Sequence, residues 1–123
     1  MRDFLTRLLV AAFACTFAAT AAFAHAFLDR AVPGVGAIVR GAPRELQLSF
    51  TQNIVLSFSG VQIATSGGAR IPSATPVLDR AAPNVLHVRL GHALKPGIYV
   101  VTWYVVSVDT HRTSGTYKFT IAP

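Results

Sequence analysis

Sulfur-containing side chains are almost absent from this sequence of 123 residues. It holds one cysteine, Cys15, and one methionine, Met1, so residues 25–123 contain neither. The absence of a cysteine pair excludes disulfides, and folding must proceed without them. The absence of thiolate and thioether groups means that a metal site in residues 25–123 has to use nitrogen and oxygen donors.

Charge is also sparse, because Asp, Glu, Lys and Arg together make up 13% of the chain. In residues 25–123, nine basic side chains against four acidic ones leave a net charge of +5. They are spread thinly, with no run of Lys and Arg interleaved with aromatic residues. A nucleic-acid surface normally has such a cluster. We therefore expect no nucleic-acid partner, and a soluble surface of modest positive charge.

The first 24 residues have the three zones of a secretory signal peptide. Arg2 and Arg7 lie near the start, an apolar run follows from Leu8 to Phe23, and Ala22-Phe23-Ala24 is a small-x-small cleavage site. We predict cleavage after Ala24, which makes His25 the first residue of the exported protein.

Two alternatives to cleavage after Ala24 are less consistent with the residues. A membrane anchor needs about 20 consecutive apolar residues, and Thr16 and Thr20 interrupt this shorter stretch. A lipoprotein would be cut before Cys15, but the preceding Ala12-Phe13-Ala14 lacks the leucine that is usual there.

Residues 25–123 are predicted to form one domain, because a chain of about this length buries a single core. Apolar and polar residues alternate in several segments, which is typical of strands with one buried face. The predicted inward-facing residues are Leu46, Leu48 and Phe50, then Val61 and Ile63, then Leu86, Val88 and Leu90, and finally Tyr117, Phe119 and Ile121. No segment after residue 24 has a convincing helical pattern.

The segment Ile98–Val108 is apolar at both odd and even positions, which favours a place at the centre of a sheet. Turn sequences such as Pro33-Gly34, Gly67-Gly68 and Pro96-Gly97 separate the strands. About seven strands without a helical crossover predict an all-β fold, an immunoglobulin-like Greek-key β-sandwich.

His25 is the most informative of the four histidines. At a free N-terminus, its α-amine and imidazole Nδ1 can close a six-membered ring with one metal ion, and the metal competes with protons for both nitrogens. The alternative is that His25 is merely the first residue after a permissive protease site. From its position alone, that alternative is favoured.

Asp109 and His111 are the second candidate pair, spaced as i and i+2. In extended backbone they would leave the same side of the chain, with Cα atoms about 6.5 to 7 Å apart. They could converge on one ion, or the aspartate could hydrogen-bond the histidine ring. A solvated turn at a strand end is the alternative interpretation.

The other two histidines are weaker candidates. His87 lies between Leu86 and Val88, so its side chain is expected to face solvent from an outer sheet face. His92 follows Gly91 in a predicted loop and is at most an auxiliary ligand. If His25, Asp109 and His111 converge, three nitrogens and one oxygen suit one Cu(II) ion better than Cu(I), which prefers sulfur.

Several motifs in order resemble the CopC family of periplasmic copper-resistance proteins, over nearly the whole of residues 25–123. They are His25-Ala26-Phe27-Leu28, Pro33-Gly34-Val35-Gly36-Ala37, Ala42-Pro43, Leu48-Ser49-Phe50, Phe58-Ser59-Gly60-Val61, Leu94-Lys95-Pro96-Gly97-Ile98-Tyr99, Thr102-Trp103, Ser107-Val108-Asp109-Thr110-His111 and Ser114-Gly115-Thr116-Tyr117-Lys118-Phe119. The resemblance implies a periplasmic Cu(II) carrier or store whose ligands match His25, Asp109 and His111. It also implies an inner-membrane partner of the CopD type.

Two departures limit what the resemblance implies. Family members often have an acidic residue soon after the position of Phe50, where this chain has Thr51-Gln52. Members that also hold Cu(I) use a Met-rich segment, which residues 25–123 lack. We therefore expect no second, Cu(I) site.

The leading hypothesis is a monomeric periplasmic protein that sequesters or delivers Cu(II), with a role in copper resistance, and that is not an enzyme. One alternative is an oxidative enzyme, because an N-terminal histidine brace is also the copper site of lytic polysaccharide monooxygenases; those are much longer chains with a flat substrate face. The other alternative is an exported, metal-free sandwich that acts as an interaction module.

Overall fold

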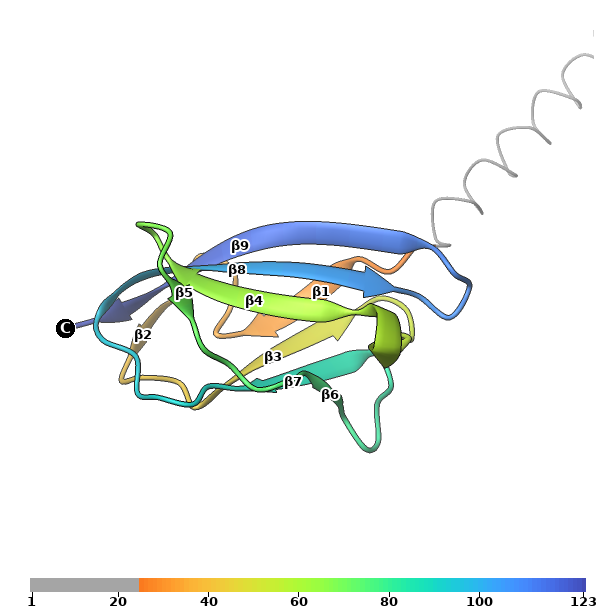
Figure 1. Ribbon diagram of the computed structural model, residues 1–123, viewed down its shortest axis with the longest axis horizontal. Helices are drawn as coiled ribbons and strands as arrows, with labels where there is room; N and C mark the ends of the chain where they lie inside the picture. Colours follow the sequence, from red (N-terminus) through yellow and green to blue (C-terminus); the bar gives the residue numbers. More distant parts are fainter. Residues whose placement is uncertain (1–24) are drawn as a thin grey trace, which may run out of the picture.

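The computed structural model describes residues 25–123, so the predicted signal peptide and its cleavage site after Ala24 lie outside the described residues. Nine strands and one turn of 3-10 helix follow one another along this part of the chain (Figure 1). They are β1 (Leu28–Val32), β2 (Ile38–Arg40), β3 (Glu45–Phe50), η1 (Leu56–Phe58), β4 (Gly60–Thr65), β5 (Arg70–Ile71), β6 (Val77–Leu78), β7 (Val85–Arg89), β8 (Gly97–Val106) and β9 (Arg112–Ala122). Within residues 25–123, no helix is long and apolar enough to cross a membrane.

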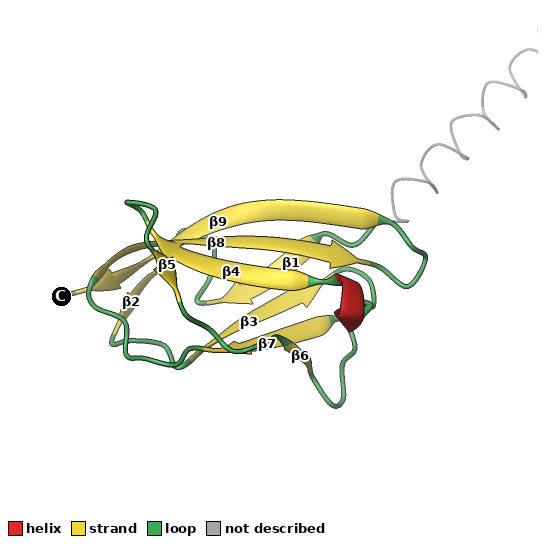
Figure 2. Ribbon diagram, in the orientation of Figure 1, coloured by secondary structure: helices red, strands yellow, loops and turns green. Residues whose placement is uncertain are grey.

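The strands form two sheets that face each other (Figure 2). One sheet has the order β1-β3-β7-β6, and the other has the order β2-β9-β8-β4-β5. Neighbours are antiparallel except β2 and β9, which run parallel. Successive strands cross repeatedly from one sheet to the other. The predicted all-β sandwich is confirmed.

The core lies between the sheets and is built from the alternating residues of the longer strands. The buried side chains include Leu46, Leu48, Phe50, Ile63, Leu86, Val88, Tyr117, Phe119 and Ile121, as the sequence pattern predicts. The rings of Phe50 and Trp103 meet edge to face across the two sheets, with centroids 5.1 Å apart. Opposite Trp103 on β9, Gly115 leaves room for the indole, since a Cβ there would come within 2.6 Å of the ring.

The strand count exceeds the expected seven because three strands are very short. β2 has three residues, and β5 and β6 have two each, which is too short for any periodic pattern to predict. The predicted central strand is β8, third of the five strands in its sheet. Only its inner face is covered: Val101 and Val105 are fully buried, whereas Ile98 and Tyr104 stay exposed. The described residues form two layers, so nothing in them covers the outer face.

The strand β8 runs from one end of the sandwich to the other (Figure 1). The connection from β7 enters β8 at one end, and the β8–β9 loop, Ser107–His111, leaves it at the other. The described chain begins beside this loop, and the C-terminus lies at the opposite end (Figure 1). The topology therefore places His25 and the Ser107–His111 loop together.

Candidate metal centre

The β8–β9 loop is a tight turn closed by its own backbone. Beyond the last ladder pair of the hairpin, the Ser107 N–H donates to the His111 carbonyl over 3.0 Å, and the Thr110 N–H donates to the Ser107 carbonyl over 2.8 Å. Thr110 has a φ of 71°, a left-handed conformation that is uncommon for a residue other than glycine. The extended backbone assumed for Asp109 and His111 is therefore wrong.

The two side chains nevertheless meet, because the turn folds one back on the other. His111 Nδ1 lies 3.2 Å from Asp109 Oδ2. At this distance the carboxylate can accept the Nδ1–H, which orients the ring and leaves its lone pair on Nε2. When that contact opens, the carboxylate and the ring can instead bind one ion together. The two side chains are 51% and 42% exposed, so the pair is open to solvent.

Ser107 forms a hydrogen bond to this carboxylate. Its side chain is fully buried, and its hydroxyl donates to Asp109 Oδ1. The hydrogen bond from Ser107 is the main reason why the pKa of Asp109 lies below its usual value; desolvation opposes this, and the contacts with His111 add to the lowering. Asp109 is thus kept anionic, as a metal-binding carboxylate has to be.

His25 reaches the same place from the other end of the sequence. Its ring and that of His111 have centroids 4.6 Å apart and planes inclined by 71°. Its ring also lies near that of Phe27, at 6.2 Å. The structure therefore brings all three predicted site residues together: His25 contacts His111, and His111 contacts Asp109.

Three hydroxyl residues at this end were not identified as site residues from the sequence. Ser107 bonds Asp109, Thr51 bonds the backbone of His25 and Phe27, and Thr113 donates to the Ala26 carbonyl. Thr51 and Ser107 belong to motifs that the sequence singles out, after Phe50 and before Asp109. No local pattern marks Thr113.

The donors lie close together, but they do not form a complete metal cage. In residues 25–123, no group of three His, Cys, Asp or Glu side chains is arranged so that it could hold a metal ion. A further donor would come from the backbone, but in the uncut chain the His25 nitrogen is part of a peptide bond to Ala24. An amide nitrogen has no basic lone pair, so this donor is created only by cleavage after Ala24.

His87 lies elsewhere, on the outer face of the four-stranded sheet, as predicted. Its Nδ1 is 3.2 Å from Glu45 Oε1, and its Nε2 is 2.8 Å from Asp79 Oδ1. The hydrogen bond to Asp79 is the main reason why the pKa of His87 is raised, and Glu45 adds to it, whereas partial burial opposes it. Both ring nitrogens are engaged, so His87 serves as a cross-link between strands.

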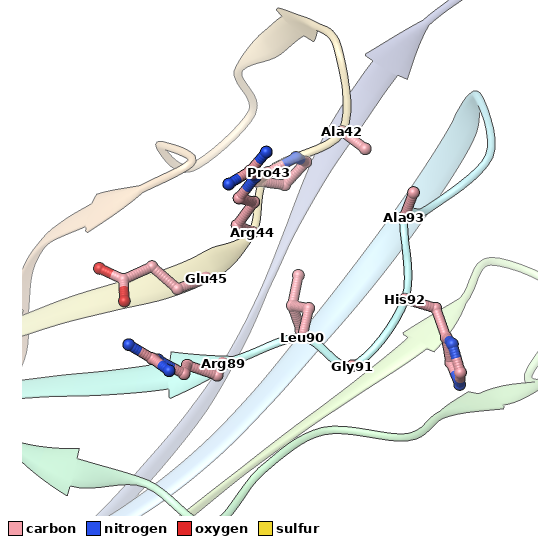
Figure 3. A pocket seen from close by; sticks show the side chains of 9 residues that line it. All are labelled: Ala42, Pro43, Arg44, Glu45, Arg89, Leu90, Gly91, His92 and Ala93. Atoms are coloured by element: carbon pink, nitrogen blue, oxygen red, sulfur yellow. The ribbon is translucent and has the colours of Figure 1, made fainter.

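His92 is on the β7–β8 connection, where Arg44 and Arg89 also line a pocket (Figure 3). This connection leads into β8 at Gly97, whereas the Ser107–His111 loop follows Val106 at the other end. A strand of ten residues extends about 30 Å at roughly 3.3 Å per residue. His92 therefore cannot complete a site at His111.

Comparison with known proteins identifies the family of this chain. Residues 28–122 match the CopC domain family. The chain is 36% identical to Protein YobA of Escherichia coli strain K12 over 99 residues, 80% of each chain. It is 34% identical to a copper resistance protein C of Escherichia coli over 109 residues, 84% of this chain and 86% of that protein.

A solved structure shows the same fold. The crystal structure of CopC from Methylosinus trichosporium OB3b superposes with a TM-score of 0.75 at 29% identity, covering 80% of this chain and 95% of that one. The family match extends over most of the chain, and the structural match covers both sheets. The protein belongs to the CopC family, whose named members include copper-resistance proteins.

Proposed function

We propose that this protein, once cleaved after Ala24, binds one Cu(II) ion through His25, Asp109 and His111. His25 contributes its α-amine and an imidazole nitrogen, His111 contributes a second imidazole nitrogen, and Asp109 contributes a carboxylate oxygen. The observation that carries the proposal is the 4.6 Å separation of the His25 and His111 rings. It is supported by the Asp109 carboxylate, 3.2 Å from His111.

The donor set favours Cu(II) over other ions. Imidazole, amine and carboxylate groups suit Cu(II) in a tetragonal field, and at a given site of this kind Cu(II) binds more tightly than Zn(II). Residues 25–123 contain no sulfur that would favour Cu(I). The ion is cargo, and the protein is a carrier or store rather than an enzyme.

The proposed setting is the periplasm, where the protein acts as a monomer in copper resistance or homeostasis. Its partner is an inner-membrane protein of the CopD type, which receives or supplies the ion. Membership of the CopC family supports this role, because relatives include a copper resistance protein C. The exposure of Asp109 and His111 is consistent with access by such a partner.

The experiment compares protein that starts at His25 with protein that starts at Ala21. The longer protein keeps every side chain of the site but turns the His25 amine into a peptide nitrogen. An extension of four residues is preferable to one, since an amine just one residue ahead of His25 could still chelate copper together with the intervening peptide nitrogen. Both proteins are titrated with Cu(II) in the presence of a competing chelator, and their EPR spectra are recorded.

The protein starting at His25 is expected to bind one Cu(II) with a spectrum typical of three nitrogens and one oxygen. The longer protein is expected to bind at least about a hundredfold more weakly, because the loss of a ligand should exceed the 10–100-fold cost of losing an outer partner. Equal affinity of the two proteins would rule out the amine as a ligand. Failure of both to bind would rule out the function.

A further inference from the structure

A site that uses the first residue of a chain has an inherent weakness. Terminal residues are ordinarily poorly ordered unless something ties them down. A free His25 would have to be immobilised each time an ion binds, and that entropic cost would weaken binding. Whatever holds residues 25–27 before the ion arrives therefore contributes to copper affinity.

On one side, residues 25–27 are held by Thr51. The β1–β3 ladder ends at the pair Leu28 and Phe50. Just beyond this pair, Phe27 and Thr51 are joined by backbone and side-chain hydrogen bonds. The Thr51 N–H donates to the Phe27 carbonyl over 2.9 Å. The Thr51 hydroxyl accepts from the Phe27 N–H over 2.9 Å and donates to the His25 carbonyl over 3.3 Å.

The chemistry of this contact requires a hydroxyl group. One oxygen atom both accepts from an N–H and donates to a carbonyl, which a serine or threonine side chain can do. An ionised aspartate at position 51 could accept from Phe27 but would face the His25 carbonyl without a proton to donate. A valine has the shape of threonine but could do neither.

On the other side, the same segment is held by Thr113. This residue lies in β9, two positions after His111, and its hydroxyl donates to the Ala26 carbonyl. Ala26 is fully buried, so its carbonyl has little access to water as an alternative partner. Thr113 thus ties the segment directly to the strand that follows His111.

The two threonines are positioned by different sheets: Thr51 directly follows β3 of one sheet, and Thr113 lies in β9 of the other. We propose that the Thr51 and Thr113 hydroxyls are positioning groups of the copper site, which hold His25 against His111 before the ion binds. This inference rests on the function proposed above. It assigns to each threonine an effect on copper affinity without any contact with the ion.

The test uses protein that starts at His25 and carries Thr51→Val, Thr51→Ser, Thr113→Val or Thr113→Ser. Each valine variant is expected to weaken Cu(II) binding by about tenfold, the size of effect seen when an outer partner of a metal ligand is lost. Each serine variant should stay close to the wild type, since it retains the hydroxyl. The EPR spectrum should keep the same donor set in every variant.

A second comparison separates positioning from a general loss of structure. In protein that starts at Ala21 the amine ligand is absent, so Thr51→Val and Thr113→Val should have much smaller effects on affinity there. Thr116→Val, on the same strand as Thr113 but with an exposed side chain, is the matched control and should leave affinity unchanged. Thermal unfolding of each variant reports whether the sandwich is intact.

The inference is overturned if both valine variants bind like the wild type, or if serine and valine weaken binding equally. It is also overturned if the valine variants lose the same affinity in the Ala21 protein as in the His25 protein. Should one valine variant fail to fold, the other decides the outcome. Absence of binding by the wild type starting at His25 would instead refute the proposed function itself.

Discussion

Two histidine clusters in this protein contain the same kinds of group and differ in what surrounds the ring. In the His87 cluster, which consists of His87, Glu45 and Asp79, each ring nitrogen faces a carboxylate, at 3.2 and 2.8 Å. At the metal end, which consists of His25, Asp109 and His111, a carboxylate meets Nδ1 of His111, and the ring packs against that of His25.

The difference bears on which of the two histidine rings is suited to bind a metal. Carboxylates on both nitrogens stabilise the imidazolium, which donates two hydrogen bonds and has no lone pair. One carboxylate on one nitrogen orients the neutral ring and leaves the other nitrogen to act as a ligand. The His87 cluster therefore favours a bound proton, and the metal end keeps the ligand atoms that the proposed function requires.

The largest expected effect is a loss of copper affinity when a histidine ring is removed from the metal end but not when one is removed from the His87 cluster. His111→Ala, in protein that starts at His25, should weaken Cu(II) binding by more than about a hundredfold, since a ligand is lost rather than an outer partner. His87→Ala should leave copper affinity unchanged. Competition titration measures both. Comparable losses in the two variants would show that the clusters are not functionally distinct.

A fall in pH is expected to have the next largest effect, on copper affinity at the metal end. Cu(II) affinity is expected to fall at least about a hundredfold between pH 7 and pH 5, because protons compete with the metal for the amine and both imidazoles. Protonation of His87, whose pKa is raised above its ordinary value, costs its cluster no contact, because both ring nitrogens then donate to carboxylates. The measurement is a titration at several pH values. An affinity that stays constant down to about pH 4.5 would contradict nitrogen ligation.

A smaller effect is expected from Ser107→Ala. The variant removes the buried hydroxyl that donates to Asp109, so the carboxylate loses one of its two fixing contacts. Copper affinity should fall by about tenfold, as for other outer partners of a ligand. Thr65→Ala, which removes a hydroxyl that accepts from the Ala69 N–H at the opposite end of the sandwich, is the control. An unchanged affinity in Ser107→Ala would mean that Asp109 needs no support.

The smallest effect concerns stability and the His87 cluster alone. The folded-state pKa of His87 is raised above its ordinary value of 6.5, so its contribution to stability is present below that pH and is lost as pH rises through the folded value. The folded-state pKa of Asp79 is lowered below 3.8, so its contribution is present above that pH and is lost in stronger acid. Both contribute between pH 3.8 and 6.5.

His87→Gln should therefore lower the thermal midpoint modestly within this window and progressively less at higher pH. Since the side chains of Glu45 and Asp79 are 44% and 35% exposed, solvent screens both ion pairs and the change is expected to be small. Thermal unfolding of the two proteins across pH measures it. A difference that grows with pH above 6.5 would mean that the neutral ring, rather than the imidazolium, is the stabilising form.

Sequence patterns predicted most of the fold, because the longer strands have one buried face. Leu46, Leu48 and Phe50 show the clean alternation that a half-buried strand requires, and all three are buried. Strands of two or three residues, such as β5 and β6, have no period to detect. They form because longer neighbours present a free edge to them.

The residues of the candidate site could be named from the sequence, but the turn and the hydrogen bonds that position them could not. His25, Asp109 and His111 could be named from the cleavage motif, the Asp-x-His spacing and the family pattern, and they lie together. The turn at Thr110, with its positive φ, could not be predicted, since threonine gives no signal for that conformation. The hydroxyl contacts of Thr51 and Thr113 join segments far apart in sequence, so no local pattern contains them.

The exposure of the metal end has a consequence for the speed of copper transfer. Asp109 and His111 remain 42% and 51% exposed on a loop held by the rigid β8–β9 hairpin. Under the proposed function, a ligand from an acceptor protein can attack the bound ion from solvent, and the ligands here can be replaced one at a time. Handover then needs no opening of the sandwich, so tight retention of the ion and rapid delivery are compatible in the same small protein.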